Sequence, residues 1–307
     1  TLNNAPEGAT VRWDNVGSAA SVDITSRTAL TTDVKAVVPG RHDITLSLFN
    51  ASGTRVASTL VKLSVPQFIV VKENVAEFDT ALATLKMTGQ KNAIIAECKK
   101  VAESILSTSN CRLIWQLGGL AEAVPASVPA ANVTTVTFRN EKSPGSGLLG
   151  DTDPGNTGTW GPTVFNETIE LYPAGYLASG AAPDIETDLE TQALVLQLTG
   201  VAAPDPALVA FGVKVFGRLF GETLAHEVMH SLLGLITPGH AHNSPIVVDD
   251  IMNPGGNRTF TQRTALVDNA HTSPVLPTNF TDKGIGAINR LKAANQTRMD
   301  AVFTIAP

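Results

Sequence analysis

The chain has 307 residues, of which 16% are charged, and a formal net charge of −6 at neutral pH. This length can bury one large or two modest hydrophobic cores. The acidic balance argues against a nucleic-acid partner, and no apolar run reaches the roughly 18 residues that span a bilayer. Cys98 and Cys111 could form one disulfide in an oxidising compartment or remain as thiols.

The first 70 residues alternate apolar and polar side chains in short runs separated by turn signals such as Pro39-Gly40. The runs cover residues 10–13, 19–24, 42–49 and 55–63. Threonine, valine and serine dominate them without helical period, which predicts β-strands. Their spacing resembles an immunoglobulin-like β-sandwich of the kind attached to secreted bacterial proteins. The alternative is an integral sheet of one larger domain.

A boundary is predicted near residues 65–67, with one domain over 1–70 and a second over 71–307. The second domain opens with two predicted helices, at 76–86 and 90–106. Ile94, Cys98, Val101 and Ile105 form an apolar stripe on the second helix. Residues 112–117 are the first predicted strand of this domain, and residues 132–138, rich in β-branched side chains, are a second.

Residues 145–161 are rich in glycine and proline and predict irregular structure. Within this stretch, Asp151, Asp153 and Asn156 could hold a structural Ca²⁺ ion through oxygen ligands, or form a solvated loop. An alternating strand is expected next, at 164–172.

A capping box predicts a helix over 187–198, and Pro206 opens another. Three glycines interrupt the apolar pattern that follows, so we expect a break or kink near Gly217. Residues 263–275 are predicted to form a loop, and residues 281–291 a capped C-terminal helix.

The predicted helix after Gly217 carries the pattern HExxH at His226, Glu227 and His230. Helix positions four apart lie on one face, so the two histidines can bind one metal ion. Glu227 lies about 100° around the axis, within reach of a water on that metal. A third protein ligand must come from outside the helix.

Downstream lie His240 and His242, and then Met252 within Ile-Met-Asn-Pro. These motifs resemble the metzincin zinc metallopeptidases of the matrixin-like kind, which run HExxHxxGxxH and continue to a methionine turn. The family spacing would place the third histidine at Ile236, which cannot bind metal. A short insertion is therefore implied, and the third ligand is one of His240 or His242.

Asp249 and Asp250 are weaker candidates for that ligand. The resemblance covers roughly residues 110–295 and is most specific over 222–254. It implies an α+β chain whose catalytic domain has a twisted mixed sheet, helices and a methionine turn at Met252. In such domains the glycine-rich loop precedes an edge strand that pairs with an extended peptide.

The resemblance further implies a Zn²⁺ ion and a general base at Glu227. The predicted function is a secreted or extracellular endopeptidase, with periplasmic and cell-surface locations included, that acts on protein or peptide substrates. Two alternatives stay open. One is an adhesion protein with a structural or degenerate metal site, and the other is a zinc hydrolase of non-peptide substrates.

Overall fold

The computed structural model describes residues 7–16, 22–36, 40–128, 130, 133–140, 142, 149–153, 168–177, 193–198, 204–233, 241–254, 257–269 and 277–302. Helices and several separate sheets give the chain a mixed α+β composition. Its residues form two compact units, Thr1–Gln67 with Met299–Pro307 and Phe68–Arg298. Over the described residues, no helix is both long and apolar enough to cross a membrane.

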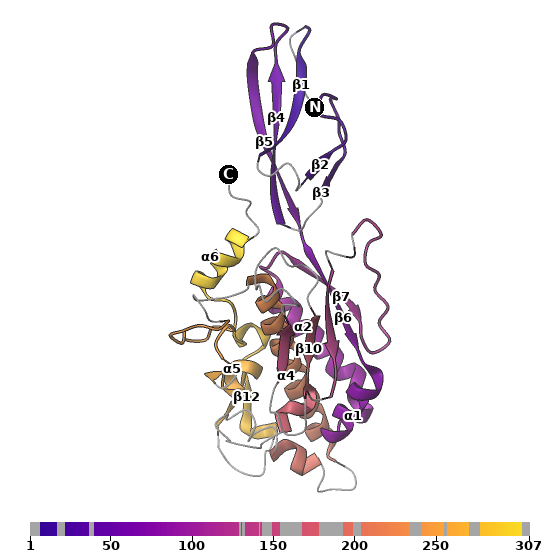
Figure 1. Cartoon of the computed structure of the whole chain (residues 1–307). Helices are drawn as coiled ribbons and strands as arrows, with labels where there is room; N and C mark the ends of the chain where they lie inside the picture. Colours follow the sequence, from indigo (N-terminus) through magenta and orange to yellow (C-terminus); the bar gives the residue numbers. More distant parts are fainter. Residues whose placement is uncertain are drawn as a thin grey trace. The chain divides into compact units, whose positions relative to one another are not determined.

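The first unit is built from two small antiparallel sheets (Figure 1). One has the strand order β1-β4-β5 and the other pairs β2 with β3. The strands are β1 (Thr10–Val16), β2 (Val22–Ile24), β3 (Val34–Ala36), β4 (Gly40–Phe49) and β5 (Arg55–Val65). Val22 and Ile24 from one sheet pack with Ile44 from the other, so the alternation in the sequence does mark the buried face.

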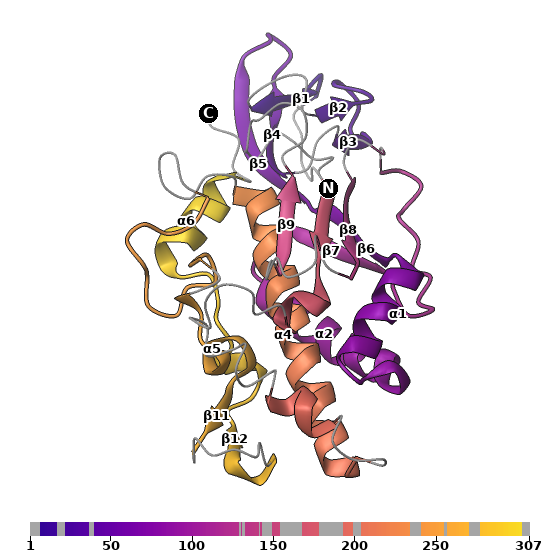
Figure 2. The same ribbon diagram turned by 60° about the horizontal axis from the view of Figure 1, so that its bottom comes forward.

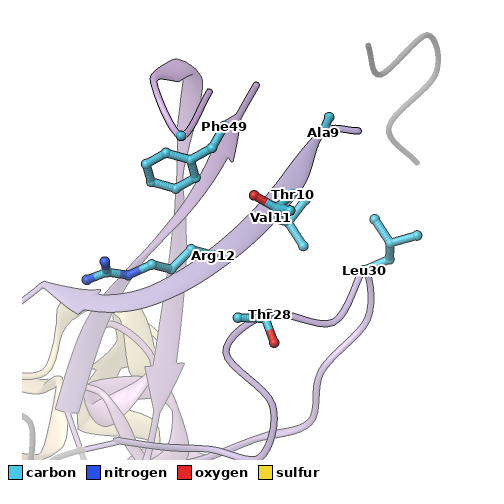
Figure 3. Close-up of a pocket in the computed structure, with 8 residues that line it drawn as sticks. Ala9, Thr10, Val11, Arg12, Thr28, Leu30 and Phe49 are labelled. Atoms are coloured by element: carbon cyan, nitrogen blue, oxygen red, sulfur yellow. The ribbon is translucent and has the colours of Figure 1, made fainter. Parts of the chain in front are cut away.

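A pocket of about 520 Å³ opens on this unit, and Figure 3 shows Phe49, Leu30 and Arg12 among its lining side chains. It contains none of the histidines of the HExxH region. Its lining comes from β1, the end of β4 and residues 28–30. The immunoglobulin-like assignment of this unit stays a prediction.

The second unit is organised around a five-stranded sheet in the order β7-β6-β8-β10-β9. The strands are β6 (Gln67–Glu73), β7 (Cys111–Gln116), β8 (Val133–Phe138), β9 (Gly150–Asp153) and β10 (Thr168–Leu171). β8 pairs in parallel with both β6 and β10, whereas β9 runs antiparallel to β10 at the edge. Because β6 belongs to this sheet, the apolar residues after the predicted boundary open the second unit.

Three helices pack in this unit: α1 (Val75–Thr84), α2 (Lys91–Leu106) and α4 (Pro206–Leu233). Figure 1 shows α2 and α4 side by side. The rings of Phe78, Phe138 and Phe220 join α1, β8 and α4, with centroids 5.2–6.4 Å apart. The predicted apolar stripe of α2 is buried, as expected.

Shorter elements complete the second unit. They are η1 (Thr88–Gln90), η4 (Pro173–Leu177), α5 (Phe260–Thr264), β11 (Leu266–Asp268), η6 (Pro277–Asn279), β12 (Phe280–Asp282), η7 (Ile285–Ala287) and α6 (Ala293–Val302), the last of which continues into the residues grouped with the first unit. Cys98 and Cys111 are both free, so the thiol alternative holds. Burial raises the pKa of Cys111 to about 12.

Of the break or kink predicted near Gly217, the break is wrong, because α4 is one continuous helix of 28 residues. Its glycines permit close packing on α2. A Cβ at Gly217 would lie 2.5 Å from the Cβ of Glu97, and one at Gly221 would lie 2.7 Å from the carbonyl oxygen of Cys98. Packing therefore outweighs the roughly 1 kcal/mol of helix propensity that each glycine gives up.

Three other local predictions are also wrong. Residues 150–153, expected to be irregular, form β9, because their backbone pairs with β10. The strand expected at 164–172 is present over its described part as β10, but it is internal and not the edge strand that the resemblance implies. Residues 281–291 are not a helix: β12 pairs with β11, Gly284 has a positive φ of 79°, and α6 begins later.

The predicted loop at 263–275 contains the end of α5 and strand β11 over its described residues. Residues 193–198 are helical, while the capping box predicted before them, at 187–190, lies outside the described residues.

Candidate metal centre

Helix α4 supplies three of the predicted site residues from one stretch near its C-terminal end. His226 and His230 are four residues apart and lie on the same face, as the helical repeat requires. Their Nε2 atoms are 3.0 Å apart. Both imidazoles are buried, so the helix aims two ring nitrogens at a single point inside the protein.

A third imidazole joins them from the segment after α4. The Nε2 of His242 lies 3.3 Å from the Nε2 of His226. One ring nitrogen from each of the three histidines lies within 4.8 Å of the others, an arrangement that could hold a metal ion. His240, the other predicted candidate, lies outside the described residues. Among those described, no further cluster of this kind occurs.

Hydrogen bonds tie the residue after His242 to the turn that contains Met252. The backbone N–H of Asn243 donates to the carbonyl oxygen of Met252 at 3.0 Å, and its side-chain amide donates to Asn253 Oδ1 at 3.0 Å. Asn295 on α6 donates to Asn243 Oδ1 at 2.9 Å. These contacts fix the place at which the chain returns towards α4. They do so although the sequence spacing between α4 and His242 is longer than in the metzincin pattern.

The same turn orients the first histidine. The Nδ1 of His226 lies 2.6 Å from the carbonyl oxygen of Ile251. Since a carbonyl only accepts, Nδ1 carries the proton and Nε2 presents its lone pair to the cluster. Met252 follows directly and is completely buried. The backbone N–H of Met252 donates to Asp250 Oδ1 at 2.7 Å. The Asp250 carboxylate is therefore engaged in a hydrogen bond within the turn.

All three imidazoles have a lowered pKa. Burial is the main cause for each, and the positive charge of Arg258 adds to it. The pKa falls to about 3 for His230. Arg258 is itself buried and ion-paired with Glu222 on α4. At neutral pH the three rings are therefore uncharged, which is the form that binds metal.

Glu227 lies beside this cluster with its carboxylate buried. Its Oε1 is 4.0 Å from the Nε2 of His226. Burial raises its pKa to about 7, and a hydrogen bond from Thr152 and the charge of Arg258 oppose that rise. A carboxyl group with this pKa can accept and return a proton near neutral pH.

Strand β9 contacts α4 (Figure 2), and its Thr152 reaches Glu227. Thr152 Oγ1 donates to Glu227 Oε2 at 2.7 Å. No sequence pattern indicates this contact, because the Gly-Asp-Thr-Asp segment at 150–153 has the composition of a turn. Asn243, Asn253, Asn295 and Arg258 were also missed, since asparagine and arginine outside a motif carry no distinctive pattern.

The predicted calcium ligands do not form a described site. Asp151 contacts Lys142 through its carboxylate. For Asp153 the backbone is described but the side chain is not, and Asn156 lies outside the described residues. The calcium site therefore stays a prediction.

Comparison of the chain with known protein families finds no matching family. Searches of curated proteins and of solved structures likewise find no significant match. The geometry of the site is therefore the basis for assigning a function.

Proposed function

We propose that the chain is a secreted zinc-dependent endopeptidase of the metzincin type, with Glu227 as its general base. The observation that carries this proposal is the convergence of three histidine nitrogens beside a buried carboxylate of the same helix. A purely structural site would not need that carboxylate. It would also be expected to supply a fourth protein ligand, and the described cluster has three.

The donor set and its spacing fit zinc. Zinc–nitrogen bonds of about 2.0–2.1 Å at tetrahedral angles place neighbouring nitrogens about 3.3 Å apart. The two Nε2 separations are 3.0 Å and 3.3 Å. Three neutral imidazoles would leave one coordination position open, as catalytic zinc sites do. His226, His230 and His242 are therefore the proposed ligands.

When bound, zinc would supply a Lewis acid that acidifies water and polarises a carbonyl group. Glu227 would take the proton of the attacking water and deliver it to the leaving amine. Met252 would support the site by filling the space beneath it, as the resemblance implies.

An extended peptide is the substrate that the neighbouring sheet edge favours. β9 pairs with β10 on one side, and over the described residues its other side is the edge of the sheet. A peptide could add there as a further strand, with main-chain hydrogen bonds fixing its scissile bond near Glu227. The N-terminal unit would then be an accessory module of a protein that works outside the cytosol.

Cleavage of a fluorogenic peptide library, measured together with zinc content, tests this function. Glu227→Ala should abolish zinc-dependent cleavage while zinc stays bound, because the base is lost and the ligands are kept. Glu7→Ala, at an exposed carboxylate of the first unit, is the matched control and should cleave normally. Unchanged cleavage in Glu227→Ala would refute the mechanism. Zinc binding with no cleavage by the unaltered protein would favour a binding or non-peptide function.

Substitution of the two candidate third ligands separates them. His242→Ala should lose most of the bound zinc after dialysis against a weak chelator, because two imidazoles remain. His240→Ala should retain the zinc and serves as the control. The opposite result would make His240 the ligand, and equal retention by both would rule out a three-histidine centre.

A further inference from the structure

We infer that Thr152 and Gly150 of β9 are positioning residues for the Glu227 carboxylate. This inference deepens the proposed function, since it takes Glu227 as the base. It assigns separate tasks to the two carboxylate oxygens: Oε2 is anchored to the sheet edge, and Oε1 exchanges the proton.

The anchor is a buried hydroxyl–carboxylate hydrogen bond. Thr152 Oγ1 lies 2.7 Å from Glu227 Oε2. Both side chains are less than 10% exposed, so water cannot easily replace the bond. Thr152 Oγ1 also lies 3.1 Å from the backbone carbonyl oxygen of Glu227, but a hydroxyl has one proton to donate. The shorter bond to the charged acceptor is the stronger one.

Gly150 provides the space that the carboxylate occupies. A Cβ at this position would lie 2.6 Å from Cγ, 2.7 Å from Oε1 and 2.8 Å from Cδ of Glu227. Gly150 is in a regular strand paired with Leu171, and its φ is not in the left-handed region. Glycine is therefore required here for room and not for backbone conformation. Any side chain would push Glu227 out of its place.

Together the two residues leave one oxygen facing the histidines. With Oε2 held by Thr152, Oε1 is the oxygen near the Nε2 of His226, at 4.0 Å. β9 thereby fixes the base, and the same strand would hold an added peptide at its open edge. β9 would then hold the general base and the substrate in a fixed position relative to each other, which efficient proton transfer requires.

Three variants test the positioning role in the full-length protein with zinc bound. Thr152→Val keeps the shape but removes the hydroxyl, and it should lower kcat about 10- to 100-fold. KM and zinc content should stay unchanged. Thr152→Ser restores the hydroxyl and should recover most of kcat. Gly150→Ala should lower kcat by about 100-fold or more, towards the value of Glu227→Ala.

A second measurement does not depend on cleavage. Cobalt(II) replaces zinc in the unaltered protein and in the three variants. Their visible absorption bands are then compared, at one pH, with those of cobalt-loaded Glu227→Ala. We expect Thr152→Ser to match the unaltered protein, and Thr152→Val and Gly150→Ala to shift towards Glu227→Ala. Crystal structures of the last two variants should have the Glu227 carboxylate turned away from its original position.

The outcomes separate the two proposals. If no peptide is cleaved but the spectra and crystal structures change as expected, the positioning role stands and the peptidase function fails. If peptides are cleaved but Thr152→Val equals Thr152→Ser in kcat and spectrum, the positioning role is overturned and the peptidase function stands. Equal loss of zinc in Thr152→Val and Thr152→Ser would also overturn it, since the role would then be structural.

Discussion

The contact between α2 and α4 depends on a glycine that can be tested by one methyl group. Substitution Gly221→Ala adds a Cβ that would lie 2.7 Å from the carbonyl oxygen of Cys98 and 2.7 Å from the Cβ of Val101. Neither atom can move independently of the α2 backbone. The two helices must therefore separate, or α4 must shift along α2.

The expected size of the effect comes from two opposing terms. Alanine gains about 1 kcal/mol over glycine inside a helix. Overpacking a close contact costs about 1–3 kcal/mol, and a clash with backbone belongs at the upper end of that range. Gly221→Ala should thus lower the free energy of unfolding by about 2 kcal/mol, which corresponds to a fall in Tm of about 4–8 °C.

Gly212 on the same helix is the matched control. A Cβ there would meet the flexible end of Met87, at 3.1 Å from Cε and 3.2 Å from Sδ, and would lie in ordinary contact with Leu198 Cδ1 at 3.6 Å. Gly212→Ala should be neutral or stabilising by up to about 1 kcal/mol. Urea and thermal unfolding of metal-free protein, followed by circular dichroism, measure both variants without a contribution from bound metal. If Gly221→Ala is as stable as Gly212→Ala, the glycine does not serve helix packing.

Helix α4 shows which of its features a sequence pattern can predict and which it cannot. The chemical face of the helix was readable, because His226 and His230 need only the helical repeat to meet. The continuity of the helix was not, because glycine lowers helix propensity whether or not a neighbour approaches it. Only the position of α2 shows that Gly217 and Gly221 serve a contact.

The edge of the sheet was missed for a similar reason. Residues 150–153 have little intrinsic strand propensity, and they become a strand because β10 supplies their hydrogen-bonding partner. Since the strand was missed, its contact with Glu227 was missed too. The return of His242 likewise depends on hydrogen bonds from Asn243 to Met252 and Asn253, which join residues too far apart in sequence for any local pattern to reveal.

Two further predictions concern the support of the site and of α4. Asn253→Ala removes hydrogen bonds that hold the segment carrying His242. The zinc affinity, measured by competition with a chelator, should therefore fall about 10-fold or more. An unchanged zinc affinity would contradict that role of Asn253. Asp282→Asn tests the ionic contacts of β12 with α4. Burial alone would raise the pKa of Asp282, but hydrogen bonds from Arg218 and Lys214 outweigh it and hold that pKa well below its usual range. A lowered folded-state pKa stabilises the fold above the unfolded pKa of about 3.9, and this contribution disappears as pH falls towards the folded value. Asp282→Asn should therefore cost about 1–2 kcal/mol at pH 7, a figure reduced for the partial exposure of the carboxylate, and the difference in urea unfolding should shrink below about pH 4. A difference that stays constant from pH 7 to pH 3 would mean that the charge of Asp282 contributes nothing to stability.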